Sequence, residues 1–126
     1  MKREAVTLGG NSNLPLSPGM KVGNFLYTSG QVGVDRSTGT VPEDAGEQTR
    51  FCFENLRKIL VAGGVDFEDV FKVNVYLTDN DDFAAMNEVY RTYFPNDPPA
   101  RTTVGTSGLA RPDFKVEIEM IALLKD

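Results

Sequence analysis

The sequence predicts an α+β fold in which two helices cover one face of a mixed β-sheet. Three observations predict it. Residues 43–64 place apolar side chains at helical spacing, residues 65–79 alternate apolar and polar side chains, and residues 81–94 return to helical spacing. Because shorter strand patterns precede and follow these segments, both helices can pack on one sheet. With 126 residues, we expect one domain spanning residues 1–126.

The N-terminal third contains short strand patterns separated by turn-forming residues. A short strand is expected at 5–8 and a loop at 11–19, where Asn, Ser, Pro and Gly are concentrated. Residues 22–25 predict a tight hairpin turn, and residues 25–30 form its return strand. Residues 35–44 form a second expected loop.

Each predicted helix carries an apolar stripe that should face the sheet. In the first helix the stripe comprises Cys52, Leu56, Ile59, Leu60 and Gly63. In the second helix it comprises Phe83, Met86, Tyr90, Tyr93 and Phe94. Gly63 is followed by Gly64, and glycine at this place is typical of a helix C-terminus.

The strand that joins the two helices has one apolar and one polar face. Its apolar face is expected to carry Phe71, Val73, Val75 and Leu77, and its polar face Lys72, Asn74, Tyr76 and Thr78. After the second helix, we expect a loop at 95–100, a strand at 101–105, a connection at 106–114 and a last strand at 115–124.

Two glutamates lie two residues apart in the last strand. Glu117 and Glu119 therefore share one face, together with Ile121 and Leu123. A sheet face that mixes carboxylates with apolar side chains is often completed by other subunits. We therefore expect a closed homo-oligomer.

Composition excludes several kinds of chemistry. The chain contains no histidine, which removes Ser/His and Cys/His nucleophile pairs and most zinc sites. Its single cysteine cannot form an internal disulfide. A net charge of −5 without any basic run disfavours nucleic-acid binding. The longest apolar run, MIALL, is too short to span a bilayer, so we expect a cytoplasmic protein with no membrane partner.

A few residues are candidates for chemistry. Arg101 opens a strand, where its planar guanidinium could bind a carboxylate or form a structural ion pair with Glu117 or Glu119. Glu117, on a partly apolar face, could have a raised pKa and transfer protons, or could be solvated or paired. Gly30, beside Ser29, could admit a ligand close to the backbone or form a bulge or turn.

Four stretches together resemble the RidA/YjgF family of imine and enamine deaminases. They are LPLSPGMKVGNFLYTSGQ, FAAMNEVYRTYF, PPARTTVG and KVEIEMIAL, in that order. The likeness covers about residues 12–125, and the pairing of ARTTVG with VEIE is its most specific part.

The resemblance implies a chorismate-mutase-like fold and a homotrimer with three clefts between subunits. It implies no cofactor and no metal. The expected reaction is hydrolysis of reactive 2-imino or 2-enamine acids, such as 2-aminoacrylate, 2-iminopropanoate and 2-iminobutanoate, to 2-oxo acids and ammonia. Small 2-imino and 2-oxo carboxylic acids, and further copies of the chain, are the expected partners.

The resemblance also implies roles for particular residues. Arg101 stands where the family holds the substrate carboxylate, and Glu117 where it orients or activates water. Ser29, Gly30 and Asn87 match residues that line the cleft.

Two positions depart from the best-known family members. Thr103 replaces a cysteine that follows the arginine by two residues, and its hydroxyl can still form a hydrogen bond. Leu16 replaces a tyrosine of the N-terminal loop and makes the expected substrate pocket less polar.

Two other functions remain open at this stage. The first is a non-catalytic protein of the same fold that binds small carboxylates for regulation. The second is an RNA-cleaving translation inhibitor, an activity attached to some relatives, which the net charge of −5 and the absence of histidine disfavour.

Overall fold

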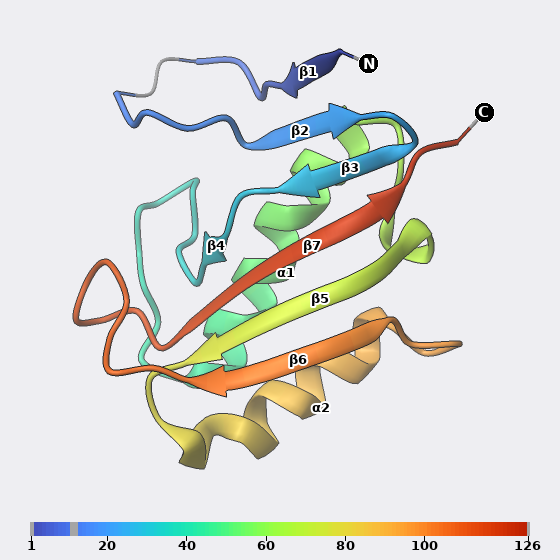
Figure 1. Ribbon diagram of the computed structural model, residues 1–126. Helices are drawn as coiled ribbons and strands as arrows, with labels where there is room; N and C mark the ends of the chain where they lie inside the picture. Colours follow the sequence, from blue (N-terminus) through green and yellow to red (C-terminus); the bar gives the residue numbers. More distant parts are fainter. Residues whose placement is uncertain (1, 11–12, 126) are drawn as a thin grey trace.

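The computed structural model describes residues 2–10 and 13–125 of the chain (Figure 1). The elements of the described residues, in chain order, are β1 (Arg3–Val6), β2 (Gly19–Val22), β3 (Phe25–Thr28), β4 (Gln31–Val32), α1 (Ala45–Ala62), η1 (Phe67–Asp69), β5 (Val70–Leu77), η2 (Asn80–Asp82), α2 (Phe83–Tyr93), β6 (Ala100–Gly105) and β7 (Val116–Leu123). The elements η1 and η2 are single 3₁₀ turns. No helix among these elements is long and apolar enough to cross a membrane.

The strands form one mixed sheet. Its order is β1-β2-β3-β7-β5-β6, and the short β4 also pairs with β7. β5 and β6 run parallel, whereas the other pairs are antiparallel. Helices α1 and α2 lie side by side on one face of the sheet (Figure 1). The predicted arrangement of two helices on one face of a mixed sheet is therefore confirmed.

Helix α1 begins and ends with local hydrogen bonds. The Asp44 carboxylate accepts a hydrogen bond from the backbone N–H of Glu47, which satisfies one of the free donors of the first turn. At the other end, the N–H of Gly63 donates to the carbonyl of Ile59, and Gly64 has φ +87°, where a side chain would be strained. The predicted glycine stop is confirmed.

The core is built around Phe53 of α1, which is fully buried. Its ring contacts four other aromatic rings, with centroid distances of 4.4 to 5.8 Å: Phe67, Tyr90, Tyr93 and Phe94. The predicted stripe of α1 is buried, as expected. In α2, Phe83 departs from its predicted place in the stripe, because 45% of it is exposed at the first turn.

The predicted burial of Phe71 is wrong. A bulge between Val70 and Lys72 shifts the register of β5 against β7. An extra residue in one strand reverses the side-chain alternation on one side of the bulge. Val70 is therefore buried, whereas Phe71 turns to the helix-free face, where it is 43% exposed and contacts Phe25.

Smaller differences occur near the N-terminus. The first strand covers 3–6 instead of 5–8, and the expected return strand breaks at residues 29–30 before β4. Residues 11 and 12 of the expected loop lie outside the described residues, and residues 13–18 are irregular, as predicted.

We predict that Phe53→Ala lowers the free energy of unfolding by about 3–5 kcal/mol, because it removes the ring that all the neighbouring aromatic side chains contact. Urea denaturation would measure the loss. The control is Phe51→Ala, two residues along the same helix, where the ring is only partly buried. Equal losses at the two positions would contradict the central role of Phe53.

Candidate functional site

Arg101 lies on the helix-covered side of the sheet. It stands near the start of β6, which is an edge strand, and pairs in register with Val73 of β5. Residues paired in a parallel ladder point to the same face, and Val73 is fully buried beneath the helices. The Arg101 side chain therefore extends toward α2.

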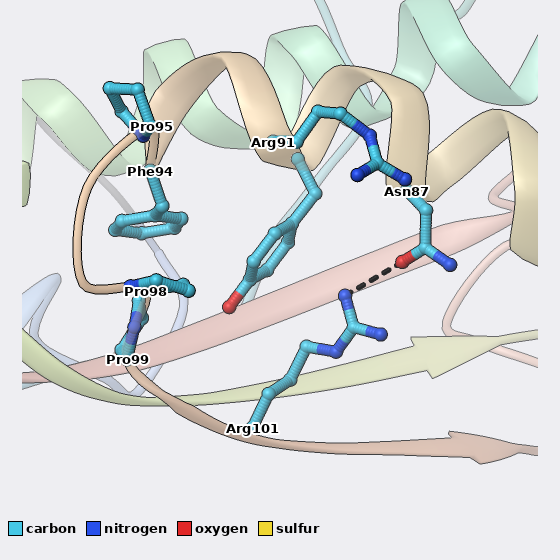
Figure 2. Close-up of a pocket in the computed structure, with 8 residues that line it drawn as sticks. Asn87, Arg91, Phe94, Pro95, Pro98, Pro99 and Arg101 are labelled. Atoms are coloured by element: carbon cyan, nitrogen blue, oxygen red, sulfur yellow. Dashed lines mark hydrogen bonds between the residues drawn. The ribbon is translucent and has the colours of Figure 1, made fainter.

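Side chains of α2 hold the Arg101 guanidinium in place. Its Nη1 donates a hydrogen bond of 2.7 Å to Oδ1 of Asn87, as Figure 2 shows. The guanidinium carbon, Cζ, lies 4.6 Å from the centroid of the Tyr90 ring and 5.7 Å from the centroid of the Phe83 ring. No carboxylate of the described residues forms an ion pair with it. The half-buried cation is thus oriented but not neutralised, as an anion receptor requires.

A groove of about 610 Å³ opens beside this cation (Figure 2). One wall comes from α2 and the other from the proline-rich loop before β6. Its lining comprises Asn87, Tyr90, Arg91, Phe94, Pro95, Pro98, Pro99 and Arg101. Apolar walls with one fixed cation suit a small organic anion.

Glu117 lies on the opposite side of the sheet. Its neighbours in β7, Val116 and Ile118, are fully buried beneath the helices, so Glu117 points to the helix-free face. Burial raises the pKa of Glu117, and the nearby charge of Glu119 raises it further. Glu119 accepts a hydrogen bond of 3.2 Å from the amide of Asn74, which marks it as the structurally held member of the pair.

Gly30 and Ser29 lie at the Glu117 side. A Cβ at Gly30 would come within 2.2 Å of Oε2 of Glu117, so only glycine leaves room for the carboxylate as it stands. The hydroxyl of Ser29 donates a hydrogen bond of 2.6 Å to the carbonyl of Ser17, which fixes the adjoining loop. The structure therefore brings together the predicted residues Ser29, Gly30 and Glu117.

Thr103 and Leu16 occupy different places. Thr103 pairs with Val75 and shares the face of Arg101. Its buried hydroxyl has no hydrogen-bond partner among the described residues. Leu16 is 56% exposed and lines a separate hollow with Arg36, Asn55 and Lys58. Leu16 does not reach Arg101 within one chain.

Apart from Leu16, the predicted site residues thus form two groups on opposite faces of the sheet. We call Asn87, Arg101 and Thr103, together with Tyr90, which was not predicted, the arginine half-site, and Ser29, Gly30 and Glu117 the glutamate half-site. Within one chain, the alternative of an ion pair between Arg101 and Glu117 or Glu119 is wrong, because the side chains diverge. Among the described residues, no group of three acidic or cysteine side chains could hold a metal ion.

The place of Tyr90 in this site was not predicted from the sequence. Helical spacing assigns Tyr90 to the apolar stripe of α2, and the ring is indeed buried there. Helical spacing places a side chain on a face, but it does not show that an arginine from a distant strand stacks on that ring. The only feature of the sequence that indicated a polar role was the hydroxyl of tyrosine, which phenylalanine lacks.

Comparison with known proteins identifies the class to which this fold and site belong. Residues 11–124 match the family model described as Endoribonuclease L-PSP. The 2-iminobutanoate/2-iminopropanoate deaminase of Mus musculus is 43% identical over 110 residues, or 86% of this chain and 81% of that protein. A RutC family protein of Pyrococcus horikoshii is 48% identical over 109 residues, or 86% of each chain.

Solved structures give the same result. The Escherichia coli YjgF gene product superposes with a TM-score of 0.89 at 33% identity, covering 97% of this chain and 99% of that one. Escherichia coli TdcF with bound serine superposes with a TM-score of 0.84 at 36% identity, covering 95% and 94%. The chain belongs to the RidA/YjgF family, as the sequence motifs predicted.

We predict that Glu117→Gln stabilises the fold at neutral pH. A carboxyl whose pKa is raised by folding binds its proton more tightly in the folded chain. Stability therefore falls as pH rises from the ordinary value of 4.5 through the raised value. Thermal melts between pH 4 and 8 should show an advantage of the variant that disappears in acid.

The control for this comparison is Glu4→Gln, which changes an exposed glutamate of β1. It should melt like the parent protein at every pH. An advantage of Glu117→Gln that does not vary with pH would contradict the burial of an ionised carboxylate.

Proposed function

We propose that this protein hydrolyses reactive 2-imino and 2-enamine acids to 2-oxo acids and ammonia. The observation that carries the proposal is Arg101, a half-buried cation that Asn87 orients and that no carboxylate of the described chain neutralises. Every substrate in this class has a carboxylate that such a receptor would bind. The deaminase activity named for the mouse relative supports the same conclusion.

The chemistry needs few groups. Arg101 holds the substrate carboxylate, which places C2 of the imine beside a water molecule. Glu117 accepts a proton as the water oxygen bonds to C2, the electron pair of the C=N bond moves to nitrogen, and the protonated Glu117 returns that proton to the nitrogen. The hydroxyl proton of the resulting carbinolamine then passes through Glu117 to the amino group, which leaves as ammonia while the hydroxyl oxygen becomes the C=O of the 2-oxo acid. A carboxyl with a raised pKa suits both transfers.

The remaining predicted residues complete the pocket. Asn87 keeps the guanidinium in position, and Thr103 contributes a hydroxyl on the same face. Ser29 and Gly30 shape the backbone beside the carboxylate of Glu117. Leu16, on the exposed N-terminal loop, would contribute an apolar contact only from another copy of the chain.

A complete site requires a second copy of the chain. The two half-sites lie on opposite faces of one sheet, so Arg101 of one copy must meet Glu117 of another. We propose a closed homotrimer, in which each cleft joins the arginine half-site of one subunit to the glutamate half-site of the next. The exposed apolar side chains of the helix-free face, such as Leu123, support burial against a partner.

Coupling the protein to a threonine dehydratase tests the activity. Release of 2-oxobutanoate should be faster than spontaneous hydrolysis. We predict that Arg101→Ala lowers kcat/KM by about 100-fold or more, because it removes the charged contact to the substrate. Glu117→Gln should lower kcat by about 100-fold or more, because amide nitrogen cannot accept the proton.

The matched control is Arg50→Ala, which changes an exposed arginine that pairs with Glu47. It should act like the parent protein. Equal rates for the parent and Arg101→Ala would exclude the proposal. A protein that binds 2-oxobutanoate but does not accelerate hydrolysis of the imine would instead be a non-catalytic carboxylate-binding protein.

A mixing experiment tests whether each site spans two subunits. Arg101→Ala and Glu117→Gln homo-oligomers should each be nearly inactive. When the two variants are unfolded together and refolded, about one cleft in four receives an intact Arg101 and an intact Glu117. Activity should therefore return to about one quarter of the parent value.

No recovery in refolded mixtures would contradict a shared site, provided that a refolded parent sample regains its activity. Native mass spectrometry of the same samples would report the number of subunits. A stable, active monomer would also exclude the shared cleft.

A further inference from the structure

The hydroxyl of Tyr90 is a buried polar group without a hydrogen-bond partner among the described residues. Tyr90 as a whole is only 6% exposed. Buried hydroxyls are nearly always hydrogen-bonded, because a buried and unpaired polar group destabilises the folded state. An exception beside a proposed binding site therefore needs an explanation.

The surroundings of Tyr90 hold its side chain rigidly. Its ring packs against Phe53, with a centroid distance of 5.6 Å, and against Phe94, at 5.0 Å. On another side the guanidinium of Arg101 lies 4.6 Å from the ring centroid. Tyr90 and Arg101 line the same groove. An anion bound to this cation would therefore lie close to the phenol.

The hydroxyl is also a donor at every pH at which the protein would work. Burial raises the pKa of Tyr90 to about 12, and the adjacent guanidinium of Arg101, through its charge and its polar contact with the phenol oxygen, offsets only part of this rise. The group therefore stays protonated, and no described acceptor takes its hydrogen.

We propose that Tyr90 is a substrate-binding residue, whose hydroxyl donates a second hydrogen bond to the carboxylate that Arg101 holds. The inference rests on the proposed function and extends it to a residue outside the expected site. Two donors from different elements, a strand arginine and a helix tyrosine, would fix the carboxylate in orientation as well as position. Orientation matters here, because water from the other half-site must meet C2 from one direction.

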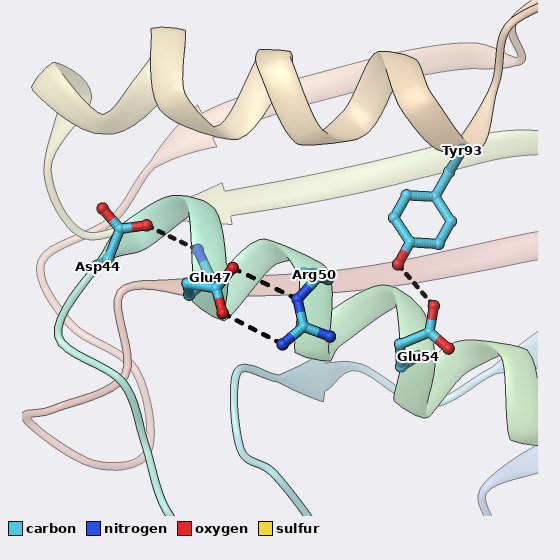
Figure 3. Close-up of polar contacts among 5 residues, drawn as sticks. All are labelled: Asp44, Glu47, Arg50, Glu54 and Tyr93. Carbon is cyan, nitrogen blue, oxygen red and sulfur yellow. Dashed lines mark hydrogen bonds and ion pairs between the residues drawn. The ribbon is translucent and has the colours of Figure 1, made fainter.

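Tyr93, on the same helix, provides a matched comparison. Its hydroxyl donates a hydrogen bond of 2.6 Å to Glu54, as Figure 3 shows, and it does not line the groove of Arg101. Its ring also packs on Phe53. The two tyrosines thus share helix and core and differ in what their hydroxyls contact.

Replacing each tyrosine by phenylalanine should give opposite results. Tyr90→Phe should weaken binding of 2-oxobutanoate, measured by calorimetry, about 10-fold or more, because a hydrogen bond to a charged group is lost. Its melting temperature should be unchanged or higher, since the hydroxyl of Tyr90 donates to no acceptor among the described residues. Tyr93→Phe should melt lower and bind 2-oxobutanoate like the parent protein.

Unchanged affinity in Tyr90→Phe would overturn the inference. A lower melting temperature with unchanged affinity would overturn it in favour of a structural role. The result of this binding test can be distinguished from the result of the deaminase assay. A parent protein that binds 2-oxobutanoate through Tyr90 but fails to hydrolyse imines would exclude deaminase activity and leave the binding role of Tyr90 intact.

Discussion

The alternation of side chains along β7 is the constraint on which the rest of the structure depends. This strand lies inside the sheet, between β3 and β5. Every second residue, from Val116 to Ala122, enters the core beneath the helices, while Glu117 and Glu119 are left on the other face. A slip of one residue would bury both carboxylates in the core, so the hydrophobic residues that fold the sheet also fix where the acid stands.

The same alternation of side chains separates Arg101 from Glu117, the two groups that the proposed imine hydrolysis would use. β6 pairs in parallel with β5, and Arg101, which is paired with Val73, points to the helix-covered face of the sheet. A cation and a carboxylate on opposite faces cannot neutralise each other within one chain. Arg101 remains available for an anion, and Glu117 remains partly desolvated with a raised pKa. The proposed sharing of the site between subunits rests on this geometry, because a second copy of the chain would bring the two groups together.

Much of the fold could be predicted from the sequence, since periodicity and glycine stops report directly on elements such as α1 and β5. Phe71 could not be placed, because a bulge depends on how two strands pair and not on the sequence of one. Motif resemblance selected Arg101, Asn87 and Glu117, and the structure divided them between two faces. Tyr90 was missed because an aromatic residue on a helical stripe is ordinarily core, and its second role arises only from contact with a distant strand.

The buried polar side chains differ in whether they have hydrogen-bond partners within the chain. Gln48 is fully buried, and both ends of its amide are bonded, to the backbone of Pro42, Asp113 and Lys115. The amide nitrogen of Asn55 donates hydrogen bonds to the carbonyls of Val32 and Val34. The unpaired buried hydroxyls among the described residues are those of Tyr90 and Thr103, and both belong to the arginine half-site. Among the described residues, the other buried polar side chains, Gln48, Thr49 and Asn55, form hydrogen bonds to backbone groups. The concentration of the two unpaired hydroxyls beside one oriented cation supports the proposed ligand contact.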